Sequence, residues 1–97
     1  MVGGVYAIRN TAAGKLLLTS TNNLAGCQNR FVFSQKNNSC VNWQLQKDWE
    51  KYGGGGFVFE VLDELVKKET QTDEEFTADI KMLEEIWREK LKKADLY

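Results

Sequence analysis

The stretch GVYAIRNTAAGKLLLTS, residues 4–20, decides the fold. It holds one apolar run over residues 5–8 and a second run over residues 15–20. The residues between them, 10–14, are turn formers, and Gly14 can adopt the positive φ that a tight turn requires. Two short runs joined by a few residues that include glycine are typical of a β-hairpin. We therefore expect the chain to be organised around a hairpin.

One further strand and three helices are expected downstream of the hairpin. Residues 57–62 (FVFEVL) alternate in the period of a strand and should complete a three-stranded sheet, with residues 63–71 as a charged, partly helical connector. The first helix follows the polar connector 21–23, which can cap it. It has a stripe of apolar residues at helical spacing and could end against the sheet at residues 31–33. The stripe consists of Leu24, Cys27 and Phe31.

The second and third expected helices also carry apolar stripes and have end signals of their own. The second helix has Ser39 as a candidate N-cap and Gly53 as a candidate left-handed cap after its last turn. Its stripe is Val41, Leu45, Trp49 and Tyr52. The third, of about twenty residues, starts at a capping box of Thr72 and Glu75. Its stripe is Phe76, Ile80, Leu83, Trp87 and Leu91, and Met82 and Ile86 should widen the buried face.

These elements predict a small α/β (α+β) fold, in which helices flank a three-stranded sheet. Their order is strand, strand, helix, helix, strand, helix, and 97 residues suffice for a single domain, residues 1–97. Such a narrow sheet needs helices over its apolar surface. No apolar run approaches the roughly 20 residues of a membrane span, and no secretory signal is visible, so we expect a cytoplasmic location.

Charge is distributed unevenly along the chain, although the net charge is −1. The first 47 residues hold five basic and no acidic side chains, whereas the remainder holds eight basic and fourteen acidic ones. Such asymmetry indicates either an anionic partner for the basic half or pairing of the two halves within the fold. With no histidine and no Cys-x-x-Cys, a structural zinc site is not expected, and Cys27 and Cys40 are interpreted as reduced thiols, with a disulfide or redox role as the alternative.

The order of these motifs resembles the GIY-YIG endonuclease family along most of the chain. The hairpin carries Gly4-Val5-Tyr6 followed by an Asn-Thr-x-x-Gly-Lys turn, like the first half of the family signature. Leu-Gln-Lys-Asp-Trp-x-Lys-Tyr-Gly, residues 45–53, looks like the helix before the third strand in homing-endonuclease-like members. The sequence LEEIW, residues 83–87, resembles the catalytic helix, with a glutamate three residues before a tryptophan.

The resemblance implies metal-dependent hydrolysis of a DNA phosphodiester, with Mg²⁺ or Mn²⁺ as the cofactor. Residue by residue, Tyr6 matches the first catalytic tyrosine and Glu84 matches the metal ligand. Leu17 stands where the second tyrosine belongs, and Cys27 stands where the catalytic arginine belongs. Cys40 falls where many members have a polar helper. The set of polar catalytic residues that the resemblance implies is therefore incomplete in this chain.

Arg30 is a candidate replacement for the missing cation, because it lies one helical turn after Cys27. With Tyr6 it forms the expected catalytic pair. The candidate nucleic-acid contacts are the basic residues near the hairpin and first helix, namely Arg9, Lys15, Arg30 and Lys36. Structural roles are the alternative for several of these residues: Tyr6 as a core aromatic with its hydroxyl at the rim, Glu84 as a solvated residue, and Cys27 as core filling. Trp43 and Trp49 are interpreted as core or rim packing residues rather than base-stacking platforms.

We interpret the chain as a degenerate GIY-YIG domain with little or no endonuclease activity and weak nucleic-acid binding, with DNA as the candidate partner. Loss of one preorganised donor costs about 10²–10³ in rate. One alternative is an active but slow metal-dependent endonuclease that uses Tyr6 and Glu84. Another is a protein-interaction module that uses the acidic second half.

Overall fold

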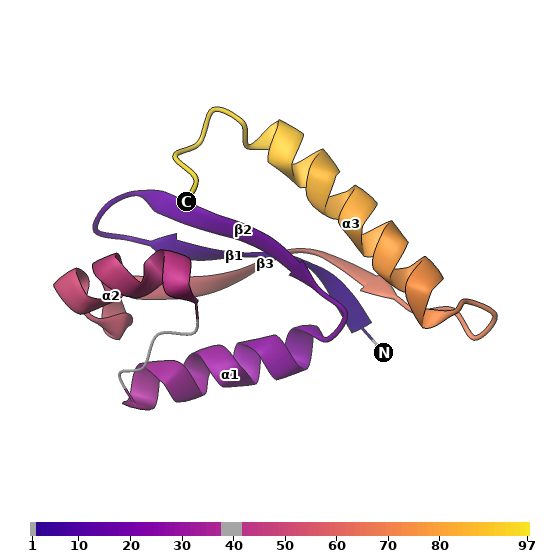
Figure 1. The fold of residues 1–97 in the computed structure, drawn as a ribbon, viewed down its shortest axis with the longest axis horizontal. Coiled ribbons are helices and arrows are strands. Elements are labelled where there is room, and N and C mark those ends of the chain that lie inside the picture. Colours follow the sequence, from indigo (N-terminus) through magenta and orange to yellow (C-terminus); the bar gives the residue numbers. More distant parts are fainter. Residues whose placement is uncertain (1, 38–41) are drawn as a thin grey trace.

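The structure, a computed structural model, describes residues 2–37 and 42–97 and contains a three-stranded antiparallel sheet (Figure 1). The central strand β1 (Val2–Asn10) lies between β2 (Lys15–Thr21) and β3 (Phe57–Val66). The elements follow in the order strand, strand, helix, helix, strand, helix. The predicted fold class is confirmed.

Strands β1 and β2 form the predicted hairpin, and Asn10 organises its turn. The Asn10 Oδ1 atom accepts hydrogen bonds from the backbone N–H groups of Ala12 and Ala13, at 3.1 and 3.2 Å. The N–H of Gly14 donates to the Asn10 carbonyl at 2.9 Å, and Gly14 has a φ of 71°. This turn sets the register of the hairpin and hence the face to which each side chain points.

Strand β3 is longer than the sequence predicted, because residues 63–66 continue the strand rather than forming a connector. Asp63 lies opposite Val5, next to a register shift in the pairing of β1 with β3. A Cβ at Gly4 would collide with the Asp63 carbonyl oxygen, so glycine allows the two backbones to approach closely. Acidic residues are tolerated here because β3 is an edge strand, and the Asp63 Oδ2 atom accepts the indole N–H of Trp87 at 3.2 Å.

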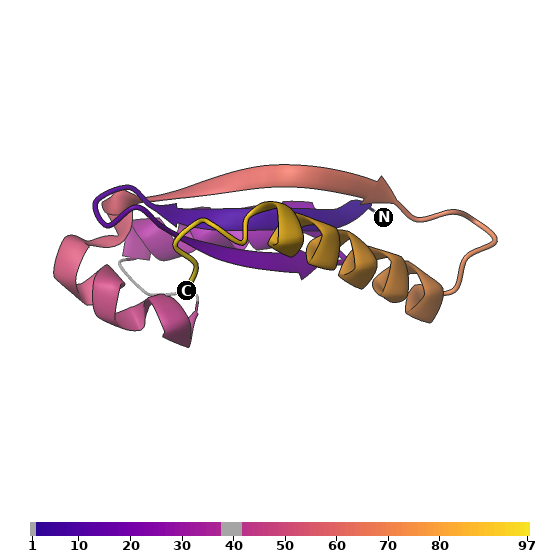
Figure 2. The same ribbon diagram turned by 90° about the horizontal axis from the view of Figure 1, so that it is seen from above.

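Helices cover both faces of the sheet (Figures 1 and 2). On one face lie α1 (Leu24–Asn37) and α2 (Gln46–Tyr52), the latter preceded by the short 3₁₀ helix η1 (Trp43–Leu45). On the other face α3 (Asp73–Lys90) runs across β1 and β2. None of the helices within the described ranges combines the length and apolar character that crossing a bilayer requires.

The apolar core is divided between the two faces, because successive side chains of a strand point to opposite sides. The α1 face holds a buried cluster made of Ile8, Leu17, Phe31, Leu45, Trp49 and Phe57. On the α3 face, the alternation directs Val5 and Ala7 of β1 toward Phe76 and Ile80 of α3, and all four are at most 1% exposed. Both layers are needed to bury the short sheet.

Helix α1 begins where the sequence predicted and continues further. The Asn23 Oδ1 atom accepts the N–H of Gly26 at 3.0 Å, which confirms that the polar connector caps the helix. Leu24 and Phe31 are buried, but the helix does not end there and extends to Asn37. The helix can continue although some of its apolar side chains are exposed to solvent, because only one face of the helix contacts the sheet.

The second predicted helix consists of η1 and α2, while its predicted N-cap Ser39 and first stripe residue Val41 lie outside the described residues. Leu45 and Trp49 are buried as predicted. After the last turn, Gly53 has φ 81° and ψ 154°. It therefore has the expected positive φ but not the left-handed helical conformation that was predicted.

Helix α3 has the predicted capping box, in which Thr72 and Glu75 each accept the other's backbone N–H. Two residues of its predicted stripe, Phe76 and Ile80, are buried, whereas Leu83, Trp87 and Leu91 are half-buried. The prediction that Met82 and Ile86 widen the buried face is wrong, since they are 63% and 50% exposed. At about 100° per residue these two side chains project to one side of the stripe, beyond the surface that β1 and β2 offer.

Candidate functional site

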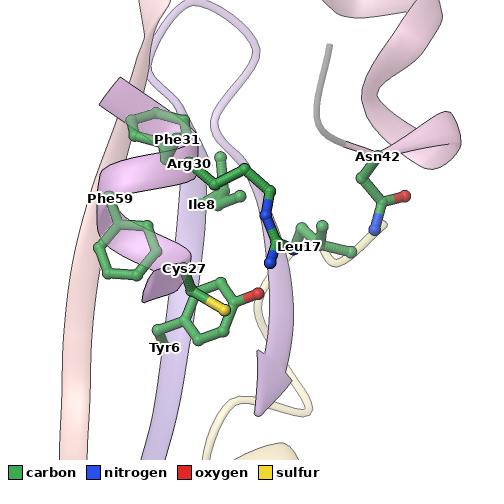
Figure 3. Close-up of a pocket in the computed structure, with 8 residues that line it drawn as sticks. All are labelled: Tyr6, Ile8, Leu17, Cys27, Arg30, Phe31, Asn42 and Phe59. Atoms are coloured by element: carbon green, nitrogen blue, oxygen red, sulfur yellow. The ribbon is translucent and has the colours of Figure 1, made fainter. Parts of the chain in front are cut away.

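A small pocket opens between the hairpin and α1 on the α1 face of the sheet (Figure 3). Its volume of about 50 Å³ is enough for a few water molecules or one compact anionic group. It is lined by Tyr6, Ile8, Leu17, Cys27, Arg30, Phe31, Asn42 and Phe59. None of these lining residues, all within the described ranges, is acidic.

Tyr6 enters the pocket from the central strand. Its ring stacks on that of Phe59, with centroids 4.7 Å apart and planes at 19°. Figure 3 shows its hydroxyl and the Arg30 guanidinium on the same side of the pocket. The aromatic stack fixes the ring, so the phenol is held at the pocket and is not a fully buried core residue.

The environment keeps the Tyr6 phenol protonated. Burial, with a smaller contribution from the adjacent Cys27, raises the pKa of Tyr6 to about 12. A hydrogen bond with Thr19 and the positive charge of Arg30 act in the opposite direction on this pKa without cancelling the rise. At neutral pH the phenol is therefore a hydrogen-bond donor and a poor general base.

Cys27 lines the pocket and is only half-buried, so the prediction that it fills core volume is wrong. Its thiol lies 3.2 Å from the Thr21 hydroxyl, to which it donates a weak hydrogen bond. This contact turns the sulfur toward the end of β2 rather than into the cluster around Phe31. The other cysteine, Cys40, lies outside the described residues.

Arg30 reaches the pocket from α1, one helical turn after Cys27, as the spacing predicted. Its guanidinium extends toward Leu17 and the Tyr6 hydroxyl (Figure 3). The structure thus brings Tyr6 and Arg30, the two residues of the expected catalytic pair, into one pocket. Leu17 contributes only an aliphatic wall there.

Glu84, the expected metal ligand, does not line this pocket. It lies on α3, which covers the opposite face of the sheet, and its carboxylate is 3.4 Å from the Arg88 guanidinium. Arg88 in turn is 3.4 Å from the carbonyl oxygen of Leu18 on β2. The pair therefore lies beside the β2 strand, and Glu84 is not among the residues that line the Tyr6 pocket.

The described lining of the Tyr6 pocket holds no carboxylate that could bind a divalent metal there. Mg²⁺ is usually held by one or two carboxylates together with substrate phosphates and waters. Glu84 is engaged by a cation, and within the described residues no three His, Cys, Asp or Glu side chains are grouped as metal ligands would be.

The predicted basic contacts have different surroundings. Arg9 forms a two-point ion pair with Glu60, with both N–O distances 3.0 Å, and the guanidinium lowers the pKa of that carboxyl. The ammonium of Lys15 lies 5.5 Å from the ring centre of Tyr97. Lys36 is exposed in the last turn of α1. Of the four, Arg30 alone lines the pocket.

Three residues at or beside the pocket were not assigned a site role from the sequence. Asn42 and Phe59 line the pocket, and Asn42 also caps η1 by accepting the N–H of Gln44 at 2.8 Å. Trp43 follows directly and is 82% exposed, contrary to the expectation that it packs in the core or at its rim. An asparagine before a short helical segment was a capping signal that the sequence offered.

The fold is shared with a known nuclease domain. The catalytic domain of the homing endonuclease I-TevI, a GIY-YIG enzyme, superposes with a TM-score of 0.65 at 21% identity, over 93% of this chain and 88% of that chain. A mutant of the catalytic domain of intron endonuclease I-TevI gives a TM-score of 0.66, also at 21% identity, over 95% of this chain and 86% of that chain. No family model and no curated protein matches the sequence.

Proposed function

Because the chain has the fold of a GIY-YIG endonuclease domain, we propose that its α1-face pocket binds a phosphate of a DNA backbone with little or no cleavage of the strand. The proposal rests on the presence of Arg30 and a protonated Tyr6 in one pocket whose described lining has no carboxylate. This pairing supplies donors without a base. The domain would then hold a phosphodiester and leave it intact.

The chemistry of the two donors suits an anionic oxygen. An arginine guanidinium presents planar N–H donors that match phosphate oxygens, and its charge persists at every physiological pH. The neutral phenol of Tyr6 adds one O–H donor beside it. Burial of the pocket walls strengthens both bonds, because fewer water molecules compete for the donors.

The same pocket is poorly equipped for hydrolysis. A nuclease of this kind needs a group that removes a proton from the attacking water and a group that stabilises the developing charge. Arg30 can serve the second need. Tyr6, with its pKa raised to about 12, does not serve the first at neutral pH, and Leu17 has no proton to exchange.

The charge of this face favours a polyanion. The first 47 residues, which supply β1, β2 and α1, contain no acidic side chain. Lys36 and Arg30 both lie exposed on α1. Binding through such residues is weakly sequence-specific and weakens as salt rises, because phosphate contacts release condensed cations.

The test is the affinity for a short labelled DNA duplex as salt is raised from low to physiological concentration. We expect measurable binding that falls with salt, and Arg30→Ala should reduce the salt slope by about one charge. Arg9→Ala is the matched control, since Arg9 is already neutralised by Glu60. DNA affinity that changes neither with salt concentration nor in Arg30→Ala would contradict the phosphate role.

A plasmid-nicking assay with Mg²⁺ and Mn²⁺ tests the lack of cleavage. We expect no nicking above the background of the protein-free reaction. Metal-dependent nicking that disappears in both Tyr6→Phe and Glu84→Ala would show that the domain is a working nuclease and would replace the proposal.

A further inference from the structure

The most exposed large apolar side chain within the described residues belongs to the residue that follows Asn42, which lines the Arg30 pocket. Trp43 is 82% exposed, while Trp49, six residues later, is 3% exposed. A solvated indole is an unusual use of a residue that normally buries much of its surface. Because Trp49 and Leu45 already complete the core on this side, Trp43 is not needed for packing.

The backbone fixes Trp43 close to the pocket. The preceding residue, Asn42, lines the pocket, and adjacent Cα atoms are about 3.8 Å apart. Asn42 is held by its cap on η1, and Leu45, two residues after Trp43, is fully buried. The start of η1 is thus anchored on both sides, and its first residue, Trp43, follows directly after the pocket residue Asn42, which Figure 3 shows.

The surrounding charge suits a nucleic acid rather than an apolar protein segment. The described residues of α1, η1 and α2 hold four basic side chains (Arg30, Lys36, Lys47 and Lys51) against two acidic ones (Asp48 and Glu50). Asp48 is further engaged by the Tyr97 hydroxyl at 2.5 Å. Exposed aromatic side chains combined with a positively charged surface are the features that proteins use to bind single-stranded nucleic acids.

We propose that Trp43 stacks on an unpaired nucleobase next to the phosphate held by Arg30, so that the preferred ligand is single-stranded DNA or an unpaired nucleotide. This inference rests on the phosphate-binding function proposed above and specifies its ligand. A base inside a duplex keeps its faces covered by its neighbours, so the indole cannot stack on it. An unpaired base has an exposed face, so the indole can stack on it without first separating it from a neighbouring base.

The experiment compares a labelled single strand of about twelve nucleotides, within the size range of single-strand sites, with the matched duplex. Trp43→Ala should weaken single-strand binding by about 5- to 150-fold, the range for one stacked base, and change duplex binding by less than about twofold. Trp43→Phe should recover part of the loss. The salt slope should not change in Trp43→Ala, because no charge is removed.

Tyr52→Ala is the matched control. Tyr52 is a partly exposed aromatic at the far end of α2, about 13 Å from Trp43 along the helical segment. It should bind single strands like the unmodified protein, and thermal unfolding should be unchanged in Trp43→Ala because the ring is solvated.

The possible outcomes separate the two proposals. Equal single-strand affinity in Trp43→Ala and the unmodified protein would overturn the stacking role, while salt-dependent binding that still requires Arg30 would leave the phosphate role intact. An equal loss on single strand and duplex would also overturn stacking. Failure of the unmodified protein to bind either DNA would overturn both.

Discussion

The two faces of the sheet differ in charge and in the chemistry they expose. Among the described residues, α1, η1 and α2 hold four basic and two acidic side chains, whereas α3 holds three basic and seven acidic ones. The α1 face has the Arg30 pocket and a solvated Trp43, while the α3 face exposes Met82 and Ile86 among carboxylates. We therefore expect an anionic ligand to favour the α1 face over the α3 face.

This difference arises from the order of residues in the chain. The basic first half supplies β1, β2 and α1, and the acidic second half supplies α3. Pairing between the halves is sparse: among the ion pairs of the described residues, Arg9–Glu60 joins the halves, and the other three lie within the second half. A charge imbalance along the sequence thus becomes a charge imbalance across the sheet.

The largest expected effect tests whether α3 packs on the face of the sheet opposite α1. Phe76→Ala should lower the free energy of unfolding by about 3–5 kcal/mol, because the fully buried ring would leave a cavity. Met82→Ala is the control and should cost less than about 0.5 kcal/mol, since that side chain is mostly exposed. Thermal and urea unfolding measure both. Equal stability of the two variants would mean that α3 does not cover the sheet as described.

The next effect tests the functional contrast between the faces. Arg30→Glu should weaken binding of a short DNA by more than about tenfold, since a hydrogen bond to a charged group contributes about 1.5–3 kcal/mol. Lys90→Glu makes the same charge change on α3 and should alter affinity by less than about twofold. If the two reversals weakened binding equally, net charge rather than the α1 face would govern the interaction.

A smaller effect tests whether the stability of α3 influences DNA binding on the α1 face. Thr72→Ala removes the side chain that accepts the Glu75 N–H and should cost about 1 kcal/mol of stability, while Thr72→Ser should retain most of it. Measured well below the unfolding temperature, DNA affinity should be the same for the unmodified protein, Thr72→Ala and Thr72→Ser. A loss of affinity in Thr72→Ala would show that α3 and the pocket are coupled.

The smallest effect is confined to alkaline pH. Burial first, then hydrogen bonding to Asp48, raises the pKa of Tyr97 to about 12, and the pKa of Tyr6 is raised to about 12 as well. Both phenols stabilise the fold fully below pH 10.0, the ordinary pKa of tyrosine, and this contribution is lost as pH rises toward 12, because the unfolded chain releases these protons first. Urea unfolding at successive pH values should show the decline.

Phenylalanine variants identify the groups responsible for that decline. Tyr6→Phe and Tyr97→Phe should each flatten the fall in unfolding free energy above pH 10.0, and each should remove one high-pH step from the tyrosinate absorbance titration. A phenol that titrates in the folded protein near pH 10.0 would mean that its site is more open to water than the structure shows.

Much of the fold could be predicted from the sequence because its signals are local. The hairpin turn around Asn10 and Gly14, the capping box of α3 and the stripe of Phe76 and Ile80 depend on residues a few positions apart. Extension of β3 through residues 63–66 could not be predicted, because it depends on pairing with a strand more than fifty residues earlier. The close approach allowed by Gly4 is visible only in three dimensions.

The candidate site was predictable to a smaller extent. The spacing of Cys27 and Arg30 correctly placed the arginine on a face near Tyr6, because helical geometry fixes such neighbours. The position of Glu84 on the far side of the sheet, and the exposure of Trp43, both depend on how separate helices dock. A residue's type and spacing do not determine which face of a sheet its helix will cover.

The most direct test uses the three tryptophans, one in each region, as internal NMR probes. In a ¹⁵N spectrum, the indole N–H signals of Trp43, Trp49 and Trp87 report on the solvated α1 face, the core and the α3 face. On addition of a single-stranded oligonucleotide, we expect the indole N–H signal of Trp43 and the guanidinium N–H signal of Arg30 to shift, with the Trp87 signal unchanged. A shift of Trp87 with no change at Trp43 and Arg30 would contradict this expectation.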